Sequence, residues 1–311
     1  MRARVPAMPA SAFSDRRVPP ATLSVLTLNL WHDAGPYARR VERIREWIDR
    51  LTPDLIGFQE ALRGDGREQV GEILGDRAYH CDYVCAARLQ RTGTDLDEGE
   101  FGNAVASRWP IVDREALRLP GAGDGETRAA LSVTVESPFG PVGLTCTHLN
   151  WKFRHGAIRE KQVVAVCDLA LRLRPRSGFP PLLVGDFNAE PESAEIRYVT
   201  GLQSLGGRSV SFLDAWRMAG DVGPGITRSN TNDYARDALE PDRRIDYIFA
   251  GFPQRNGVGR IEHCRVVCDD ARDGVWPTDH FGVYAELRTE PLPDRDARWG
   301  LAGGDDVDAS S

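Results

Sequence analysis

No stretch of the sequence approaches the ~20 consecutive apolar residues that a transmembrane helix needs, so we expect no such helix. The first 20 residues also lack the continuous apolar run of a secretory signal. We therefore expect no cleaved signal and, by default, a cytoplasmic location. Internal repeats, low-complexity segments and a break in composition are absent as well. With 41% hydrophobic and 27% charged residues, the 311-residue chain fits a soluble globular protein rather than a disordered or fibrous one.

The chain also lacks an excess of positive charge, and it contains almost no lysine. Its 39 basic residues are outnumbered by 46 acidic ones, which gives a net charge of −7. We therefore do not expect it to wrap long duplex nucleic acid by bulk electrostatics, although a cleft can differ in sign from the whole surface. Lys152 and Lys161 are the only lysines. The other basic residues are arginines, whose planar guanidinium groups suit phosphate binding.

Cysteine pairs with the CxxC spacing of common zinc knuckles are missing. Two segments share another spacing, in which a His-Cys pair is followed four residues later by a second cysteine. A zinc site is one interpretation of this repeat, but reduced thiols packed in strands are the interpretation we favour. The six cysteines are Cys81, Cys85, Cys146, Cys167, Cys264 and Cys268.

The hydrophobic pattern predicts one domain with strands and helices interspersed along it. We expect residues 1–20 to form a flexible N-terminal arm, residues 21–289 a single domain and residues 290–311 a flexible C-terminal tail. A proline- and glycine-containing turn at 137–141 predicts a hairpin, so the sheet is not purely parallel. Helices are predicted at 39–51, 67–74, 157–173 and 193–200. Strands are predicted at 22–30, 54–59, 79–87, 103–107, 111–119, 128–136, 142–147, 181–184, 245–250, 262–268 and 282–287. The predicted class is therefore α/β or α+β, with sheets inside and helices outside.

Acidic, amide and imidazole residues interrupt the apolar strands at their ends. A carboxylate beside a buried strand costs free energy unless it is paired or bound to a cation. Each case alone is typical of a turn or a cap, but together they predict one rim where strand ends converge, as ligand sites do in α/β folds. These residues are Asn29, Gln59, Glu60, His148, Asn150, Asp186, Asn188, Asp246, Asp279 and His280.

The residue types in this set favour a hard divalent cation together with proton transfer. The carboxylates of Glu60, Asp186 and Asp279, with neighbouring asparagine oxygens, suit Mg²⁺ or Mn²⁺. Histidine is a poor magnesium ligand, so the imidazoles at 148 and 280 favour proton transfer or phosphate stabilisation. A buried aspartate such as Asp246 can orient a histidine and raise its basicity.

With this set of polar residues at its strand ends, the chain resembles the endonuclease/exonuclease/phosphatase superfamily over about residues 22–289. The superfamily includes pancreatic-type deoxyribonuclease, apurinic-site endonucleases, neutral sphingomyelinases, inositol-phosphate 5-phosphatases and messenger-RNA deadenylases. The resemblance implies a four-layer α/β/β/α sandwich of two packed mixed β-sheets, with the site at one edge. It also implies a Mg²⁺- or Mn²⁺-dependent hydrolase of phosphate esters. The matching segments read TLNLW (27–31), IGFQE (56–60), GNAVASRWPI (102–111), THLN (147–150), VGDFNAEP (184–191), RRIDYIF (243–249) and TDHFGV (278–283).

The resemblance also assigns roles to single residues. Glu60 is implied as the principal metal carboxylate, with Asn29 and Asp279 close by. Asp186 and Asn188 would orient or deprotonate the attacking water and hold a phosphate oxygen. Asp246 and His280 would form a carboxylate–imidazole pair at the scissile phosphate. His148 would stabilise the transition state or protonate the leaving oxygen.

Flanking residues are candidates for contacts with the substrate. Arg128 is interpreted as a phosphate contact or, equally, as a surface arginine, and Asn150 as a second polar contact at the rim. Trp151 is either a stacking lip or the edge of the core. Residues 152–161 are basic and 225–232 polar, which would suit substrate loops but is more typical of solvated segments.

The substrate is less sharply defined than the chemistry. We expect hydrolysis of a phosphodiester, in nucleic acid or in a small molecule. The alternative is a lipid headgroup or sugar-phosphate phosphoesterase, and a catalytically silent binding module is disfavoured because every expected site position is occupied. His148 disfavours the apurinic-site enzymes, and the Phe187-Asn188-Ala189 sequence disfavours the inositol phosphatases. The acidic loop 91–100 would repel an extended polyanion if it lined the cleft. No protein partner is implied.

Overall fold

The computed structural model describes residues 21–64, 66–90, 98–175 and 178–292. The expected arm at 1–20, the tail beyond residue 292 and most of the acidic loop at 91–100 lie outside this part of the chain. The predicted domain boundaries therefore stay a prediction. In the described residues, no helix is both long and apolar enough to cross a membrane.

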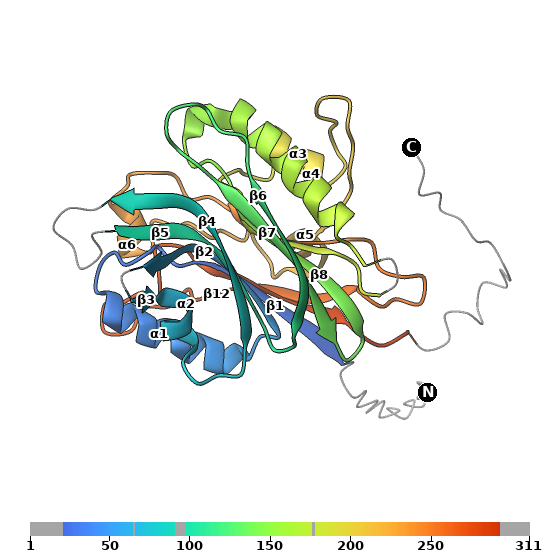
Figure 1. Cartoon of the computed structure of the whole chain (residues 1–311), viewed down its shortest axis with the longest axis horizontal. Helices are drawn as coiled ribbons and strands as arrows, with labels where there is room; N and C mark the ends of the chain where they lie inside the picture. Colours follow the sequence, from blue (N-terminus) through green and yellow to red (C-terminus); the bar gives the residue numbers. More distant parts are fainter. Residues whose placement is uncertain (1–20, 65, 91–97, 176–177, 293–311) are drawn as a thin grey trace, which may run out of the picture.

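The first of two sheets is built from both ends of the described chain (Figure 1). Its strand order is β12-β13-β1-β2-β5-β4, and the short β3 pairs with β2. Strands β1 and β2 run parallel, and the other pairs are antiparallel. The strands are β1 (Thr22–Asn29), β2 (Leu55–Gly64), β3 (Arg67–Glu68), β4 (His80–Gln90), β5 (Glu98–Ser107), β12 (Ile261–Val267) and β13 (Gly282–Arg288).

The second sheet comes from the middle of the chain, in the order β10-β11-β9-β8-β7-β6. The predicted hairpin is present as β7 and β8, while β8 and β9 run parallel. The sheet is thus mixed, as expected. Its strands are β6 (Ile111–Arg118), β7 (Ala129–Ser137), β8 (Gly140–His148), β9 (Leu182–Asp186), β10 (Leu213–Asp214) and β11 (Asp246–Ala250).

The alternation of residues along each strand places one core between the sheets and one core outside each sheet. In β1, Leu23 and Val25 pack between the sheets, whereas Leu26 and Leu28 pack against the helix layer outside the first sheet. This is the period of two that side chains follow along a strand. Polar Gln59 lies between the sheets near the strand ends, where it donates to Cys146 Sγ.

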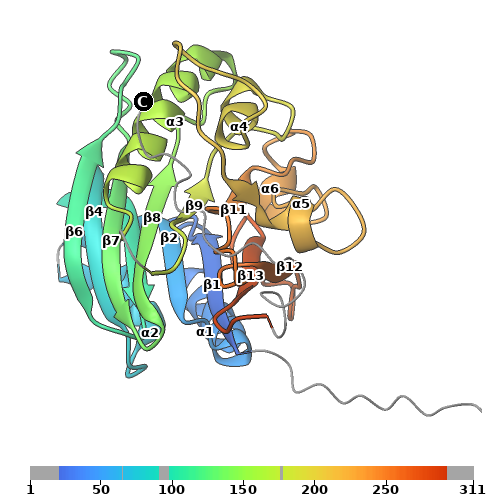
Figure 2. The same cartoon turned by 90° about the vertical axis from the view of Figure 1, so that its right-hand side faces the viewer.

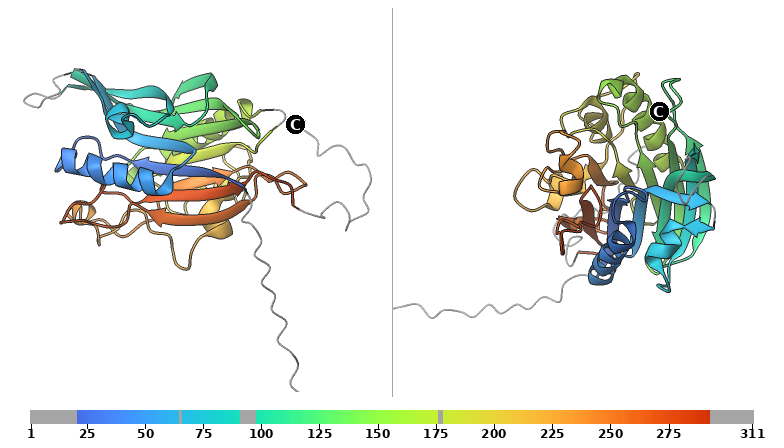
Figure 3. Two further views of the ribbon diagram at one scale, coloured as in Figure 1. Left: turned by 90° about the horizontal axis from the view of Figure 1, so that it is seen from below. Right: turned by 90° about the vertical axis from the view of Figure 1, so that its left-hand side faces the viewer.

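Helices cover the outer faces, which confirms the four-layer α/β/β/α sandwich. Figure 2 shows α3 and α4 on one side of the sheets and α1 on the other, and the same layers are visible in the right-hand view of Figure 3. The predicted spacing of α1 is correct, since Val41, Ile44, Ile48 and Leu51 are buried. The helices are α1 (Tyr37–Leu51), α2 (Gln69–Leu74), α3 (Gly156–Arg172), α4 (Ala194–Val199), α5 (Ala215–Ala219) and α6 (Asp233–Arg236), with a 3₁₀ turn at Phe153–His155.

The sequence pattern missed β3, β10, α5 and α6, which are too short to show a periodicity. Side-chain caps mark two of them, since Asp214 accepts from Trp216 N and Asn232 accepts from Tyr234 N.

The cysteines are free thiols. The two His-Cys pairs lie in β4 and β12, at opposite edges of the first sheet. They do not converge on a common site. Cys264 and Cys268 are buried, as packed thiols would be, whereas Cys81 is exposed.

Candidate active site

The topology brings the carboxyl ends of four strands to one edge of the sandwich. Asn29 at the end of β1 pairs in register with Gln59 of β2, and His148 at the end of β8 pairs with Asp186 of β9. The Nδ2 of Asn29 donates to Asp186 Oδ2 across 3.0 Å and so joins the two sheets. Strands β11 and β13 run the other way, so they begin at this edge and contribute Asp246 and the adjoining His280. The predicted convergence of strand ends is therefore present.

A pocket of about 420 Å³ opens at this edge. Its lining includes six residues that the sequence predicted, namely Glu60, His148, Asp186, Asn188, Asp279 and His280. The remaining lining residues are Trp31, His32, Trp151, Arg228, Glu240 and Arg243.

Asp186 is the centre of the hydrogen-bond network. Its Oδ1 accepts from the backbone N–H of Asn188 at 2.8 Å, while its Oδ2 lies 3.3 Å from His148 Nε2 and 3.9 Å from His280 Nε2. Burial, followed by the nearby carboxylate of Asp246, raises the pKa of Asp186 to about 6. A carboxylate with a pKa close to neutrality is suited to exchange a proton with a bound water.

His148 is held as a neutral imidazole. Arg128 Nη1 lies 2.9 Å from its Nδ1, and a guanidinium only donates, so Nδ1 accepts and the ring proton sits on Nε2. Burial, the Arg128 charge and His280 together place the pKa of His148 well below its usual range. The acceptor within reach of the Nε2 proton is Asp186 Oδ2, at 3.3 Å, because the nearby Nδ2 of Asn188 is itself a donor and donates to the Leu149 carbonyl. His148 can therefore donate one hydrogen bond at the site without carrying a charge.

His280 is held in the opposite state. Its Nδ1 lies 2.9 Å from Asp246 Oδ2, and its backbone N–H donates to the Thr278 hydroxyl. Burial alone would lower the pKa of His280, but the carboxylates of Asp246, Asp279 and Asp186 outweigh it and raise the pKa to about 10. The ring is thus an imidazolium at neutral pH, with Nε2 directed toward Asp186. The site pairs one neutral and one charged imidazole.

Glu60 reaches the pocket through an irregularity in β2. The register between β2 and β5 shifts between Phe58 and Ala61, and Glu60 adopts a φ of 56°, in the left-handed region that non-glycine residues rarely occupy. Bulges of this kind re-aim side chains next to active sites. Removal from bulk water and the nearby Asp279 raise the pKa of Glu60 to about 7.

The oxygen donors at this end of the pocket fit a hard divalent cation. Glu60 accepts one hydrogen bond from Asn29 Nδ2, at 3.3 Å, and Asp279 pairs with Arg228 at 2.6 Å. Carboxylate oxygens are ligands that Mg²⁺ and Mn²⁺ take, whereas Asn29 turns its amide nitrogen toward Glu60 and its oxygen accepts from the Trp31 backbone N–H. Asp186, Asp246 and His280 also lie close enough together to hold an ion. Their proximity has another explanation, because a protonated imidazole between two carboxylates needs no metal.

Arg128 and Asn150 lie behind the pocket rather than in its lining. Arg128 is 6% exposed and joins His148 to Glu126, whose Oε1 accepts from Arg128 Nε at 2.9 Å. The Nδ2 of Asn150 donates to the second oxygen of Glu126. The surface interpretation of Arg128 is therefore wrong, and its contacts point to control of the His148 ring. Direct contact of either side chain with a substrate stays a prediction.

Sequence reasoning missed the residues that hold the rim. Arg40 is 1% exposed and donates to the carbonyls of Leu30, His32 and Pro277, which ties the loop after β1 to the loop that carries Asp279. Its position within a helix gave no signal of this role. Arg228 lies in the polar segment 225–232, for which the sequence favours an ordinary solvated loop, and its side chain lines the pocket.

Comparison with known proteins gives one family. The sequence model described as the Endonuclease/Exonuclease/phosphatase family matches residues 26–280 of the chain. The chain is also 25% identical over 180 residues to YbhP of Escherichia coli K12, a protein described as uncharacterized. That alignment covers 54% of this chain and 67% of YbhP.

Solved structures share the architecture. An endonuclease/exonuclease/phosphatase from Beutenbergia cavernae DSM 12333 matches with a TM-score of 0.62 and 26% identity, over 86% of this chain and 71% of that one. D. rerio TDP2, solved with a single-strand DNA product, matches with a TM-score of 0.66 and 19% identity, over 86% and 99% of the two chains. At this identity the likeness to TDP2 establishes the fold alone.

Proposed function

The chain belongs to the Endonuclease/Exonuclease/phosphatase family, whose members are metal-dependent phosphoesterases, and on that premise we propose that it hydrolyses phosphodiesters with Mg²⁺ or Mn²⁺. The substrate would be nucleic acid or a small diester. One observation carries the proposal: Asp186 stands between a neutral histidine and a charged one, at a pocket into which further carboxylates converge. This arrangement provides a base, a donor and a cation within one hydrogen-bond network.

Asp186 is the proposed residue for the attacking water. Its Oδ2 already accepts from Asn29, and its Oδ1 is fixed by the Asn188 backbone, so the carboxylate cannot rotate freely. With a pKa of about 6, it is mostly ionised at neutral pH and able to take up a proton. Asn188, held by the Leu149 carbonyl at 3.2 Å, would place its amide against a phosphate oxygen.

The two imidazoles would serve the phosphoryl oxygens. In-line displacement increases the negative charge around phosphorus, and preorganised donors and cations stabilise that charge. His280, kept protonated by Asp246, is the proposed cation. His148, whose proton is fixed on Nε2 by Arg128, is the proposed neutral donor. Arg228 adds a second cation to the rim.

Glu60 and Asp279 are the residues proposed to hold the divalent ion, with Asn29 orienting Glu60 through its amide nitrogen. The ion, when bound, would act as a Lewis acid on the phosphoryl or leaving oxygen. Glu60 is the strongest candidate among them, because burial disfavours its ionised form and the neutral amide of Asn29 that donates to it does not balance the charge.

The proposal is tested by hydrolysis of bis(p-nitrophenyl) phosphate, with p-nitrophenyl phosphate and single-stranded DNA alongside. Each compound is assayed with Mg²⁺, Mn²⁺ or EDTA, for the wild type and for Asp186→Asn. We expect metal-dependent cleavage of the diester that the substitution abolishes. Cleavage of the monoester alone would instead support the lipid-headgroup or sugar-phosphate alternative. Absence of cleavage under every condition would contradict the proposed activity.

A further inference from the structure

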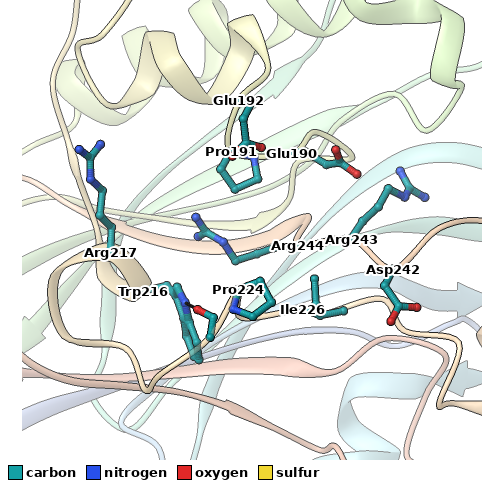
Figure 4. Close-up of a pocket in the computed structure, with 11 residues that line it drawn as sticks. Glu190, Pro191, Glu192, Trp216, Arg217, Pro224, Ile226, Asp242, Arg243 and Arg244 are labelled. Atoms are coloured by element: carbon teal, nitrogen blue, oxygen red, sulfur yellow. Dashed lines mark hydrogen bonds between the residues drawn. The ribbon is translucent and has the colours of Figure 1, made fainter.

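A second pocket of about 400 Å³ adjoins the candidate active site, and the side chain of Arg243 lines both. Figure 4 shows Pro191 and Glu192 on one side of this pocket, Trp216 and Pro224 on the other, and Arg244 between them. The lining comes from the loop after β9, from α5, from the loop that follows α5 and from the segment before β11. We call it the adjoining pocket. A ligand that extends from the scissile phosphate past Arg243 would enter it.

The apolar walls of the adjoining pocket are preformed. The Nε1 of Trp216 donates to the carbonyl of Gly223 at 3.1 Å, which anchors the loop to the ring. Gly225, with a φ of 69°, lies so close to the indole that an added Cβ would be 2.5 Å from its Cε2. The loop and the ring therefore fix each other. Pro224 and Ile226 extend the apolar wall toward the segment that carries Arg228.

Two mostly buried arginines line the pocket and keep donor groups on their guanidinium ends. Arg243 and Arg244 are 5% and 8% exposed, and both line the pocket. Both side chains are held in place: Arg244 by Asp214 at 2.8 Å, and Arg243 by Glu240 and the ring of Phe153. A guanidinium carries five N–H donors, more than these contacts occupy, so donors remain for a ligand in the pocket.

Charges of both signs surround the pocket, and this decides the class of ligand. The lining contains the carboxylates of Glu190, Glu192 and Asp242 and the guanidinium groups of Arg217, Arg243 and Arg244. A second phosphate on the ligand would be repelled by these carboxylates. An acyl chain would cover the charged side chains without giving them partners, which costs free energy. Both ligand classes are therefore disfavoured. A nucleobase offers apolar faces together with an edge of alternating donors and acceptors, for which carboxylates and guanidinium groups are the usual partners.

We propose that the adjoining pocket binds the base of a nucleotide whose phosphate occupies the candidate active site. The proposal rests on the proposed phosphodiesterase function, and it narrows the substrate class to nucleotide-containing esters. Arg243 forms the boundary that the sugar crosses. Glu192 and Arg217, which are exposed at the rim, read the polar edge of the base.

Binding measurements test the pocket separately from the chemistry. Two compounds are titrated calorimetrically into the full chain with Mg²⁺: adenosine 5′-monophosphate and the methyl glycoside of ribose 5-phosphate. They share the sugar and the phosphate, but only the nucleotide carries a base. Phosphate release is followed in the same samples. We expect the nucleotide to bind at least about tenfold more tightly than the methyl glycoside, which is the lower range of what base contacts contribute. The ratio of these two affinities is the quantity compared between variants. Glu192→Gln and Arg217→Ala are expected to reduce this ratio severalfold.

The matched control is Glu136→Gln, an exposed carboxylate on β7 that lies outside both pockets. It is expected to leave the ratio at its wild-type value. Equal affinities of the two compounds in the wild type would overturn the base site, and so would a ratio that the two pocket variants leave unchanged. Neither result depends on hydrolysis. A chain that binds the nucleotide preferentially but cleaves no diester would refute the proposed function alone.

Discussion

Replacing Glu60 by glutamine is expected to stabilise the metal-free protein at pH 8. Desolvation and the nearby Asp279 raise the pKa of Glu60 from 4.5 to about 7. A group with a raised folded-state pKa contributes stability that is fully present below its unfolded pKa and lost as the pH rises through its folded pKa. For Glu60 this window runs from pH 4.5 to about 7. At about 1.4 kcal/mol per pH unit, the loss amounts to about 3 kcal/mol of unfolding free energy.

Glutamine keeps the shape of the side chain and the oxygen that accepts from Asn29, but it carries no charge. In EDTA at pH 8, the Tm of Glu60→Gln is therefore expected to exceed the wild-type Tm by roughly 6 °C, at about 2 °C per kcal/mol for a large domain. At pH 5 the wild-type Glu60 carboxyl is protonated in the folded state. The difference in Tm between the variant and the wild type is therefore expected to be less than half of its value at pH 8. Differential scanning calorimetry at the two pH values measures both quantities.

Magnesium supplies the second half of this experiment. If Glu60 holds the ion, MgCl₂ raises the wild-type Tm at pH 8, because binding to the folded state stabilises it, and leaves the variant unchanged. Glu136→Gln removes an exposed carboxylate and is expected to behave as the wild type throughout. A variant no more stable than the wild type in EDTA would refute the argument from burial. An equal magnesium effect on both proteins would refute the assignment of Glu60 as a ligand.

Further substitutions separate the roles of the two histidines from the stability of the fold. His280→Gln is expected to lower kcat on bis(p-nitrophenyl) phosphate at least ~100-fold, the lower end for a group that assists proton or charge transfer, and an unchanged kcat would exclude that role. Asp246→Asn removes the main support of the raised pKa of His280, so the alkaline limb of the pH–rate profile is expected to move to lower pH; a limb that stays in place would show that another group titrates there. Arg128→Leu removes the donor to His148 Nδ1 and is expected to raise the pKa of that imidazole, which NMR titration of the ring would detect. Phe187→Ala opens a cavity in the core beneath α3 and α4 and is expected to cost about 3–5 kcal/mol of unfolding free energy, measured by urea denaturation.

The sequence predicted the layers and the location of the site because both depend on long, periodic signals. Apolar strands of five or more residues alternate visibly, and their polar ends lie at positions that the topology must bring together. Strands β8 and β9 illustrate this, since each ends on the residue, His148 or Asp186, that pairs with the other in the site.

What the sequence did not predict depends on contacts between distant segments. The resemblance already implied that Asp246 pairs with His280, but the neutral state of His148 is set by Arg128, which carries no signal of this partner in the sequence. The left-handed conformation of Glu60 arises from a register shift against β5, which no local pattern encodes. Two-residue strands and single-turn helices around the rim likewise follow from capping and packing rather than from periodicity.

The strand order of the first sheet also constrains when the candidate site can form during synthesis of the chain. Strand β1 pairs with β13, where Thr22 lies opposite Arg288. Because β1 is synthesised early and β13 late, this pairing can form only near the end of synthesis. Such distant pairings slow folding, and an unpaired β1 edge is a point of aggregation until β13 arrives. Asn29 and His280, which belong to the same site, come from these two ends of the chain. A nascent chain that has not yet released His280 from the ribosome therefore holds an incomplete candidate site.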